Sequence, residues 1–598
     1  MSKGKRLKGV PRQEHRKILH NVKCILFRKE TRYLSTKSTD PQATMVASEE
    51  TWTCELENAS GHDFVPATVE LKGINNQFLE SQGAKSGFSA LVATEGIVEG
   101  GDGTMAMTIP PAALVKVLEQ PTTLGNKLRR QSGRKRRNLA ATSGTLKTLV
   151  VRVIAKNGIG PIANTVQLRS DVFEDKVCLK SQYEACSHGR LKIEPFTGYT
   201  ETNRYIKDGV VSVGVDVAPI EGNKDNFEVA AKNRATEIYG DLGSQFDLVM
   251  FCIPPGTGPW LAYAYINRFD SFFNDEWCSS VSTQVHEVGH NLGLAHSGKD
   301  TDVYGDQSGM MGFSYKDDDF PLMCFNPAKS YQLGWYREQQ DFVNPLTDIL
   351  PMKYSREYIL NGVDDFDRGE SGVKEDLIIL RLKQQNSRED YYIGFNRKKG
   401  RNAETVKDAN CVTIVKKTSG PNEYGQSWQV STLCEIQDSY TINNYDESSF
   451  DVTVKLISII GKDAKVDIIA SNSALCDTVR DSTSLRYKNK KRRNCNWVSK
   501  RKSRRCSKTW TNRPLSEWCP LTCGSCSGQL NIYSSGFGMN DSLPSTLCVD
   551  AQNVSFQNNF AKNCGWVGKE EEKKDERCAK EWLGIALSEF CPKTCGSC

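Results

Sequence analysis

One motif near the middle of the chain constrains the local structure more than any other feature. Residues 286–296 read H-E-V-G-H-N-L-G-L-A-H. On a helix, His286 and His290 are four residues apart and share one face, so both imidazoles can reach one metal ion. Gly293 allows the chain to leave the helix in a conformation that other residues resist. The turn that follows then brings His296 to the same point.

The three histidines predict a catalytic zinc site. Three neutral imidazole nitrogens on Zn²⁺ leave a fourth position open for water, whereas protein ligands fill all four positions of a structural site. Glu287 lies beside this position without being a ligand. It is the candidate general base that takes a proton from the water and passes it to a leaving amine. The chain has only seven histidines, so this motif rarely arises by chance in an inert helix.

The sequence around the motif predicts a layered catalytic domain. Apolar, β-branched segments at 148–154, 209–217 and 246–253 indicate strands, and a helical repeat of apolar residues lies between the last two. Strand–helix–strand order is typical of an α/β layer. After Trp335 the period changes to two, with strands expected at 377–382, 391–395, 411–416, 450–456 and 466–469. We therefore expect an α/β (α+β) domain with a mixed sheet, followed by a β-sandwich-like region.

Cysteine is concentrated at the C-terminus. Twelve of the 21 cysteines lie between Cys476 and Cys598, in two copies of a similar spacing. This pattern predicts two small disulfide-rich modules, 476–526 and 548–598, in an oxidising compartment. We therefore expect a secreted protein. Because the residues after Met1 do not form an unbroken apolar signal segment, the true start lies upstream, export is unconventional, or the chain is cytosolic.

Charge and hydropathy exclude two further classes. With 78 basic and 72 acidic residues the net charge is +6, which does not favour a nucleic-acid partner. No apolar run is long enough for a transmembrane helix. The stretch Arg486–Lys508 is an exception in being densely basic. In a secreted protein its expected partner is an acidic polysaccharide, and the alternative is a solvated positive face.

The first 137 residues are expected to form a separate, propeptide-like segment. The segment ends in a basic run, Arg134–Arg137, set among glycine, serine and other basic residues. In a secreted chain such a run favours processing after Arg137, with a mature start at Asn138; the alternative is a solvated loop. The expected order is then a propeptide-like segment at 1–137, a peptidase domain at 138–340, a β-rich domain at 341–470 and the two modules.

Three segments give the chain a family resemblance. HEVGHNLGLAHSG, YGDQSGMMGFSY and CFNPAKSYQLGW resemble the gametolysin family of metzincin peptidases, over roughly residues 145–470. The resemblance implies one Zn²⁺ held by His286, His290 and His296, with Glu287 as general base. It also implies an N-terminal propeptide and digestion of extracellular-matrix or cell-wall glycoproteins. Met311 is favoured as the Met-turn residue beneath the metal, with Met310 as the alternative.

The resemblance implies further roles near the metal. Metzincins hold an extended substrate along an edge strand, here Leu261, Ala262, Tyr263, Ala264 and Tyr265, although the periodicity fits an interior strand equally well. Cys54, or else Cys24, is a candidate latency switch that would occupy the open zinc position; the alternative is a disulfide or a buried thiol. Some metzincins bring a tyrosine to the metal from just past the Met-turn, where Tyr315 is the candidate.

Cysteine spacing predicts part of the disulfide framework. The C-terminal repeats resemble six-cysteine ShKT-type modules, whose pairing is first to sixth, second to fourth and third to fifth. That pairing implies Cys476–Cys526, Cys495–Cys519, Cys506–Cys523, Cys548–Cys598, Cys564–Cys591 and Cys578–Cys595. In the peptidase region, Cys278 and Cys324 flank the motif and could form a bond that holds the zinc helix. The seven cysteines from Cys178 to Cys434 leave one free or paired elsewhere.

Functions of different classes remain open at this point. The first is a secreted zinc endopeptidase that acts on matrix or cell-wall proteins. The second is a non-catalytic matrix-adhesion or channel-ligand protein that acts through the six-cysteine modules. A third, an intracellular metal protein, is motivated only by the absent signal segment. The intact Glu287 favours the first, because a decayed site usually loses this carboxylate or a metal ligand first.

Overall fold

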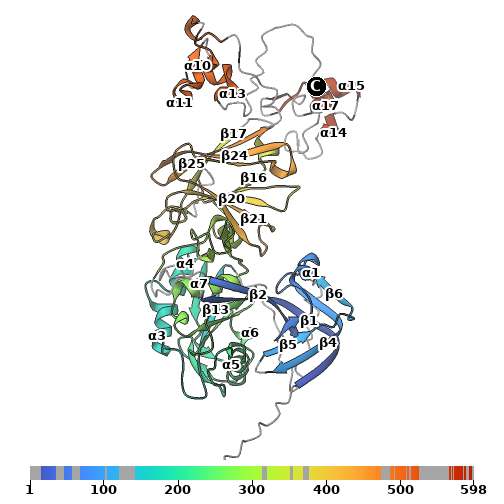
Figure 1. Cartoon of the computed structure of the whole chain (residues 1–598), viewed down its shortest axis with the longest axis vertical. Coiled ribbons are helices and arrows are strands. Elements are labelled where there is room, and N and C mark those ends of the chain that lie inside the picture. Colours follow the sequence, from blue (N-terminus) through green and yellow to red (C-terminus); the bar gives the residue numbers. More distant parts are fainter. Residues whose placement is uncertain are drawn as a thin grey trace, which may run out of the picture.

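The computed structural model describes residues 15–34, 46–56, 68–101, 104–119, 142–312, 320–349, 355–367 and 376–472, most of 482–523 and parts of 564–595. In Figure 1 a blue N-terminal unit (15–119) lies beside a green α/β region (142–335), which contains the histidine motif and is called the peptidase region below after the sequence-based expectation. The yellow and orange β-rich region follows, and the C-terminal modules lie at the far end from the N-terminal unit.

A mixed sheet forms the centre of the peptidase region. In the order β11–β7–β12–β14–β13, the first four strands are parallel and β13 is antiparallel, while β8 pairs with the first half of β7. The strands are β7 (Gly144–Ile154), β8 (Leu191–Pro195), β11 (Val210–Gly214), β12 (Leu248–Ile253), β13 (Trp260–Tyr265) and β14 (Asp270–Asn274). The strands predicted near 148–154, 209–217 and 246–253 are confirmed.

Helices cover both faces of this sheet because its strands are apolar on both sides. Along β12, Leu248 and Met250 point into one core, whereas Val249 and Phe251 point into the other. The first core also contains residues of α4 and α7, and the second contains the apolar face of α5. The helices are α3 (Thr165–Arg169), α4 (Leu179–Cys186), α5 (Lys224–Tyr239), α6 (Leu242–Gln245), α7 (Val281–Asn291) and α8 (Pro327–Leu333).

The N-terminal unit is a sheet that closes on itself. Its strands follow the order β1–β2–β3–β5–β4–β6, and β1 also pairs with β4. A core with Leu26, Trp52, Leu91 and Met107 fills the interior. The elements are β1 (His15–Leu34), β2 (Val46–Leu56), β3 (Thr68–Lys72), α1 (Asn76–Ser81), β4 (Ser89–Gly101), β5 (Thr104–Thr108) and β6 (Val115–Glu119).

The N-terminal unit and the peptidase region share one continuous sheet through β1. The second half of this long strand pairs antiparallel with β13, with Lys29 opposite Tyr265 and Thr31 opposite Tyr263. Strand β13 therefore lies between β14 and β1. It is the outermost strand at this end of the peptidase region's sheet, and β1 of the N-terminal unit pairs with its outer edge.

The β-rich region consists of two sheets that face each other across a common core, as in a β-sandwich. One sheet has the order β15–β22–β21–β20–β19–β16 and the other β18–β17–β25–β24–β23. Strand β15 (Ser297–Lys299) directly follows His296, so the β-rich region reaches the histidine motif. The other strands are β16 (Gln340–Val343), β17 (Ser355–Asn361), β18 (Asp376–Leu377), β19 (Ile379–Leu382), β20 (Asp390–Phe395), β21 (Val412–Lys417), β22 (Ser427–Leu433), β23 (Ser439–Ile442), β24 (Phe450–Ile460) and β25 (Asp463–Asn472).

The disulfides of the C-terminal modules agree with the pairing that the resemblance implies. Second-to-fourth and third-to-fifth bonds are present in both copies: Cys495–Cys519, Cys506–Cys523, Cys564–Cys591 and Cys578–Cys595. The first-to-sixth pairs, Cys476–Cys526 and Cys548–Cys598, lie outside the described residues. Short helices carry the bonded cysteines, among them α10 (Cys495–Ser499), α13 (Pro520–Cys523), α14 (Cys564–Val567), α15 (Glu571–Cys578) and α17 (Pro592–Cys595).

For the other cysteines, the possible bond between Cys278 and Cys324 is wrong, whereas the disulfide alternative for Cys54 is confirmed. Cys278 bonds to Cys252 and Cys324 bonds to Cys186, so no bond joins Cys278 to Cys324. Cys54 bonds to Cys24 inside the N-terminal core, which rules out either sulfur as a zinc switch in this form of the chain. A further bond joins Cys411 to Cys434, and Cys178 is a buried free thiol.

Within the described part of the chain, none of the helices has the length and apolar character needed to span a bilayer.

Candidate metal centre

Helix α7 and the turn after it place the three histidines. The helix follows Ser280, runs to Asn291 and is buried throughout. Gly293 then adopts a positive φ of 85°, and its N–H donates to the carbonyl oxygen of His290 at 2.9 Å. The next N–H, of Leu294, donates back to the carbonyl oxygen of Gly289 at 2.9 Å. This glycine-dependent turn reverses the chain and brings His296 beside the helix.

Backbone carbonyl groups fix the orientation of two of the imidazoles. His286 Nδ1 lies 3.0 Å from the carbonyl oxygen of Met310, and His290 Nδ1 lies 2.8 Å from that of Leu294. A carbonyl oxygen only accepts, so each Nδ1 carries the proton and each Nε2 keeps a lone pair. The three histidines each direct a ring nitrogen to one place, with all three atoms within 4.8 Å of one another.

These nitrogen atoms lie in an environment that favours a cation. His290 Nε2 and His296 Nε2 are 3.3 Å apart, and His286 Nε2 has no hydrogen-bond partner among the described residues. Burial lowers the pKa of His286 well below its ordinary value, that of His290 to about 4 and that of His296 to about 3. The imidazoles are therefore neutral near pH 7. Two converging lone pairs, of His286 and His290, together with the neutral ring of His296 match the ligand set of a Zn²⁺ ion.

Glu287 lies next to this group on the same helix. Its side chain is fully buried, and neither carboxylate oxygen has a hydrogen-bond partner among the described residues. Burial raises its pKa well above the ordinary value, Arg32 acts in the opposite direction, and Glu30 reinforces the rise. A buried carboxylate with a raised pKa and open oxygens is suited to take up and release a proton.

Met310 and Met311 lie in a buried 3₁₀ turn, Met310–Gly312, that packs against α7. The two methionines have different roles. The Met310 backbone carbonyl holds His286, whereas the Met311 side chain packs on the helix. A Cβ at Gly289 would lie 2.6 Å from Met311 Sδ, so this glycine makes room for that contact. Met311 is thus the methionine side chain beneath the histidine helix.

Strand β1 brings two charged residues of the N-terminal unit into the centre. Glu30 is fully buried, with one carboxylate oxygen against His296 Nε2 and the other 3.2 Å from His290 Nε2. Arg32 is 1% exposed, and its Nη1 lies 3.9 Å from Glu287 Oε1. The phenol of Tyr304 donates to Glu30 Oε1 at 2.6 Å, and its ring lies 4.2 Å from that of His296.

No sequence motif indicates Glu30, Arg32 or Tyr304 as residues of the centre. No local pattern marks the first two, because their position depends on the pairing of β1 with a strand more than two hundred residues away. Tyr304 precedes the turn at Met310–Gly312. The tyrosine that the family resemblance suggests, Tyr315, lies outside the described residues, as does the processing site at Arg137. The proposed edge strand, Leu261–Tyr265, does lie beside the centre, with its outer edge taken by β1.

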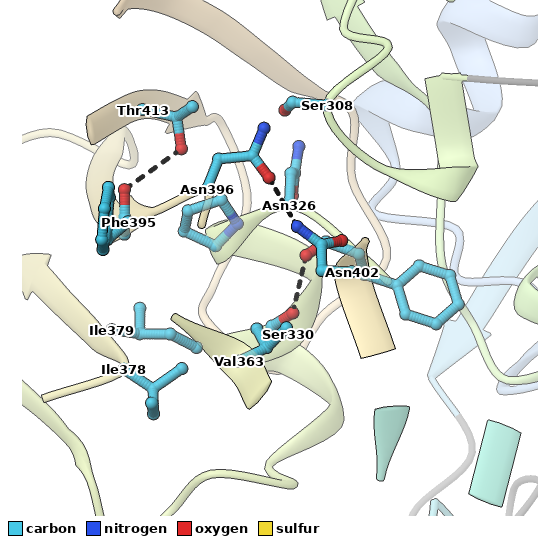
Figure 2. Close-up of a pocket in the computed structure, with 13 residues that line it drawn as sticks. Ser308, Asn326, Ser330, Val363, Ile378, Ile379, Phe395, Asn396, Asn402 and Thr413 are labelled. Carbon is cyan, nitrogen blue, oxygen red and sulfur yellow. Dashed lines mark hydrogen bonds between the residues drawn. The ribbon is translucent and has the colours of Figure 1, made fainter. Parts of the chain in front are cut away.

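A separate cavity lies at the junction of the peptidase and β-rich regions. Asn396 and Asn402 are turned toward each other (Figure 2), and a hydrogen bond of 2.8 Å joins them. The Ser330 hydroxyl donates to the carbonyl oxygen of Phe325. Asn326, which also lines the cavity, donates to Asp306, Ser297 and Ser427. None of the three histidines lines this cavity. The hydrogen bond from Asn326 to Ser427 joins the two regions at this cavity.

Comparisons with known proteins agree with the class of site. Residues 147–355 match the family model described as gametolysin peptidase M11, so this part of the chain is similar to that family. The match ends close to the beginning of β17 and contains the whole histidine motif and the turn at Met310–Gly312.

Two individual proteins are similar over limited ranges. The chain is 29% identical to the autolysin of Chlamydomonas reinhardtii over 94 residues, and the alignment spans 14% of each protein. The crystal structure of wild-type OgpA from Akkermansia muciniphila aligns with 56% of this chain and 93% of its own, at 9% identity and a TM-score of 0.25. A score this low supports no argument about the fold.

The turn after α7 predicts that replacing Gly293 destabilises the protein. A Cβ at this position would overlap Asn267 Oδ1, in addition to the strain of the positive φ. Gly334 has a similar φ of 69° but open space around it, so Gly334→Ala is a matched control. We expect Gly334→Ala to lower the free energy of unfolding by about 1 kcal/mol from backbone strain alone.

Gly293→Ala should lower this free energy by a further 1–3 kcal/mol or so, because the added methyl group must displace packed neighbours. It should also reduce bound zinc, since His296 follows the turn. Denaturant unfolding and elemental analysis of both variants provide the comparison. Equal destabilisation and full zinc content in both would show that the turn does not position the third histidine.

Proposed function

We propose that this chain is a secreted, zinc-dependent endopeptidase that hydrolyses proteins of the extracellular matrix or cell wall. One observation carries the proposal: three neutral imidazole nitrogens converge beside a buried carboxylate, Glu287, neither oxygen of which has a hydrogen-bond partner among the described residues. A purely structural metal site does not require a non-ligating carboxylate beside its ligands. The eight disulfides among the described residues suit an oxidising, extracellular compartment.

The residues of the centre divide the chemistry among them. His286, His290 and His296 would hold Zn²⁺, in line with metzincin peptidases. Zinc, when bound, supplies Lewis acidity that lowers the pKa of water and polarises a carbonyl group. Glu287 takes a proton from the attacking water on a carboxylate oxygen and gives it to the leaving amine. Met311 packs beneath the helix and keeps the two helical imidazoles in place.

Strand β13 is the element best placed to hold an extended substrate. Its outer edge runs past the metal centre and pairs with an extended chain, β1, by backbone hydrogen bonds. A substrate segment that replaces β1 would form the same ladder, which gives affinity with little demand on side chains. Matrix and cell-wall proteins as substrates follow from the resemblance to gametolysins. Loops around β13 would set the cleavage specificity.

The alternative function is a matrix-adhesion or channel-ligand protein that acts through the two six-cysteine modules. The modules carry the disulfide bonds that a small rigid binding surface needs. This alternative gives no reason for Glu287 to lie buried beside three converging histidines. We therefore assign the modules a binding role within a peptidase.

Glu287 provides the direct test of catalysis. Glu287→Ala in the mature enzyme should retain zinc, because the histidines bind it, and should lose peptidase activity by about 10²–10⁴-fold. Cleavage of casein or gelatin and elemental analysis measure the two properties. His290→Ala is the companion variant and should lose the metal as well as the activity. Activity within a few-fold of wild type in Glu287→Ala would exclude this residue as general base.

Processing after Arg137 is the proposed first step of activation. We expect the secreted active enzyme to begin at Asn138, because the basic run joins the N-terminal unit to the peptidase region. N-terminal sequencing of the active form measures this. Arg137→Ala should yield an uncleaved chain of low activity, whereas Arg129→Ala, in the same segment but outside the run, should be processed normally. A mature start far from Asn138 would refute the site.

The first six-cysteine module carries the proposed polysaccharide site. Lys488, Lys490, Arg492, Lys500 and Arg504 are exposed around a stacked pair of rings, Tyr487 and Trp497, whose centroids are 5.4 Å apart. Guanidinium groups of Arg493 and Arg505 lie over the Trp497 ring at 5.5 and 3.9 Å. A rigid surface of cations and aromatic rings suits an acidic polysaccharide, whose sugar faces stack and whose acid groups pair with the cations.

Neutralising this surface should weaken attachment without changing catalysis. We expect a variant with residues 490–493 changed to glutamine to lose retention on an acidic polysaccharide resin, and wild-type retention to fall with salt because exposed charges are screened. Cleavage of a small soluble peptide should stay unchanged. The matched control changes Lys569, Lys573, Lys574 and Lys580 of the second module. Salt-independent retention, or equal retention of both variants, would contradict the site.

A further inference from the structure

Strand β1 delivers an acidic and a basic side chain to the metal centre from the same face. Glu30 and Arg32 are two residues apart, the repeat at which side chains of a strand share a side. Both are buried, at 0% and 1% exposure. Glu30 contacts His290 and His296, and Arg32 lies beside Glu287. Arg32 is therefore opposite a group of opposite charge, whereas the carboxylate of Glu30 faces neutral imidazoles.

Glu30 has the position of a metal ligand. Its two oxygens contact the Nε2 atoms of His296 and His290, and His290 Nε2 presents a lone pair because its Nδ1 donates to the carbonyl oxygen of Leu294. An acceptor oxygen 3.2 Å from the acceptor nitrogen of His290 is repulsive unless a cation lies between them. Carboxylate oxygen is an ordinary ligand of zinc, alongside histidine nitrogen. The phenol of Tyr304 holds Glu30 Oε1 from the side at 2.6 Å, which fixes the direction of the carboxylate.

Arg32 has the position of a counter-ion for the general base. Its Nη1 lies 3.9 Å from Glu287 Oε1, and its guanidinium carbon lies 5.1 Å from the centre of the Tyr304 ring. Neither its Nε nor its Nη1 has a hydrogen-bond acceptor among the described residues. A buried guanidinium of this kind is costly unless a charge nearby compensates it. Here Glu287 is that charge.

The register of β1 is fixed by contacts outside the centre. The Lys29 ammonium lies 2.8 Å from Asp225 and 3.2 Å from Glu228, both on α5. The N–H of Ile266 donates to the carbonyl oxygen of Arg28 at 2.9 Å. Since a shift by one residue would turn Glu30 and Arg32 away from the centre, these contacts determine which side chains enter it.

We propose that Glu30 is a displaceable fourth ligand of the metal and that Arg32 neutralises the general base, so that β1 holds the centre closed. This inference rests on the proposed zinc peptidase function. The switch is a carboxylate on a strand that also occupies the substrate edge of β13. It replaces the cysteine switch that the disulfide between Cys24 and Cys54 excludes.

Access to the metal in the uncleaved chain tests the proposal independently of peptidase activity. The full chain carrying Arg137→Ala is loaded with Zn²⁺, and binding of a small hydroxamate chelating inhibitor is measured by calorimetry. We expect weak binding, because only the fraction of molecules with β1 displaced can bind. Glu30→Gln should tighten this binding by about tenfold or more, since the open fraction rises and apparent affinity follows it.

Two controls match the charge changes. Glu49→Gln, on β2 and exposed, removes a carboxylate of the N-terminal unit away from the histidines, and should leave the affinity unchanged. Arg32→Gln should tighten hydroxamate binding, whereas Arg16→Gln, on the exposed part of β1, should not. Equal affinities of Glu30→Gln and Glu49→Gln would overturn the role of Glu30. Equal affinities of Arg32→Gln and Arg16→Gln would overturn that of Arg32.

A spectroscopic experiment tests the proposal without a substitution at Glu30 or Arg32, so it applies even if those variants do not fold. The Arg137→Ala chain and the mature enzyme are each loaded with Co²⁺, whose visible spectrum reports its ligands. The spectrum should change when β1 is removed, because a carboxylate leaves the metal. Identical spectra would overturn the proposal while leaving the peptidase intact. A chain that binds neither Zn²⁺ nor Co²⁺ would instead refute the zinc peptidase assignment itself.

Discussion

The two hydrogen bonds from imidazole Nδ1 atoms to backbone carbonyl groups are the constraint on which the centre depends. They determine which nitrogen of His286 and His290 carries the proton, and so which lone pairs face inward. One carbonyl belongs to the turn after α7 and the other to Met310, at the Met-turn. The positions of these two backbone segments thereby become part of the metal site. The buried packing around α7 serves to hold them still.

Two extended chains, β1 and the proposed substrate, pair with the same edge of β13. In the uncleaved form β1 pairs with it, and in the proposed active form an extended substrate does. The two partners compete because main-chain hydrogen bonding does not distinguish between sequences. What distinguishes β1 is the pair of charged side chains that it brings to the histidines and to Glu287. Specific closure comes from side chains, whereas the general affinity for the edge comes from the backbone.

The sequence predicted those parts of the site that lie close together along the chain. The spacing of residues 286–296 predicts the helix, the turn and the converging histidines, because periodicity and glycine conformation are local properties. The strands and helix before the motif follow from apolar patterns in the same way. The pairing within the C-terminal modules could be transferred because cysteine spacing is itself the family signature.

Long-range contacts could not be predicted in this way. Periodicity shows that Leu261–Tyr265 is apolar and extended, but it does not show which strand lies beside it. The expected bond between Cys278 and Cys324 failed for a similar reason: disulfide pairing depends on distance in the fold, and Cys252 has its Cα 5.6 Å from that of Cys278. Glu30 and Arg32 resemble any charged residues of a half-exposed strand until the register with β13 is known.

Cleavage after Arg137 and opening of the centre would be two separate steps. A cut after Arg137 would leave the β1–β13 ladder and the buried Lys29 contacts intact, because neither involves the linker. Its effect would be to turn an intramolecular partner into a separate chain, which loses the high effective concentration that the linker provides. After dilution outside the cell, the released unit can dissociate, and substrate then competes for the edge of β13. In this scheme the cut makes closure reversible, and exchange of one strand for another opens the site.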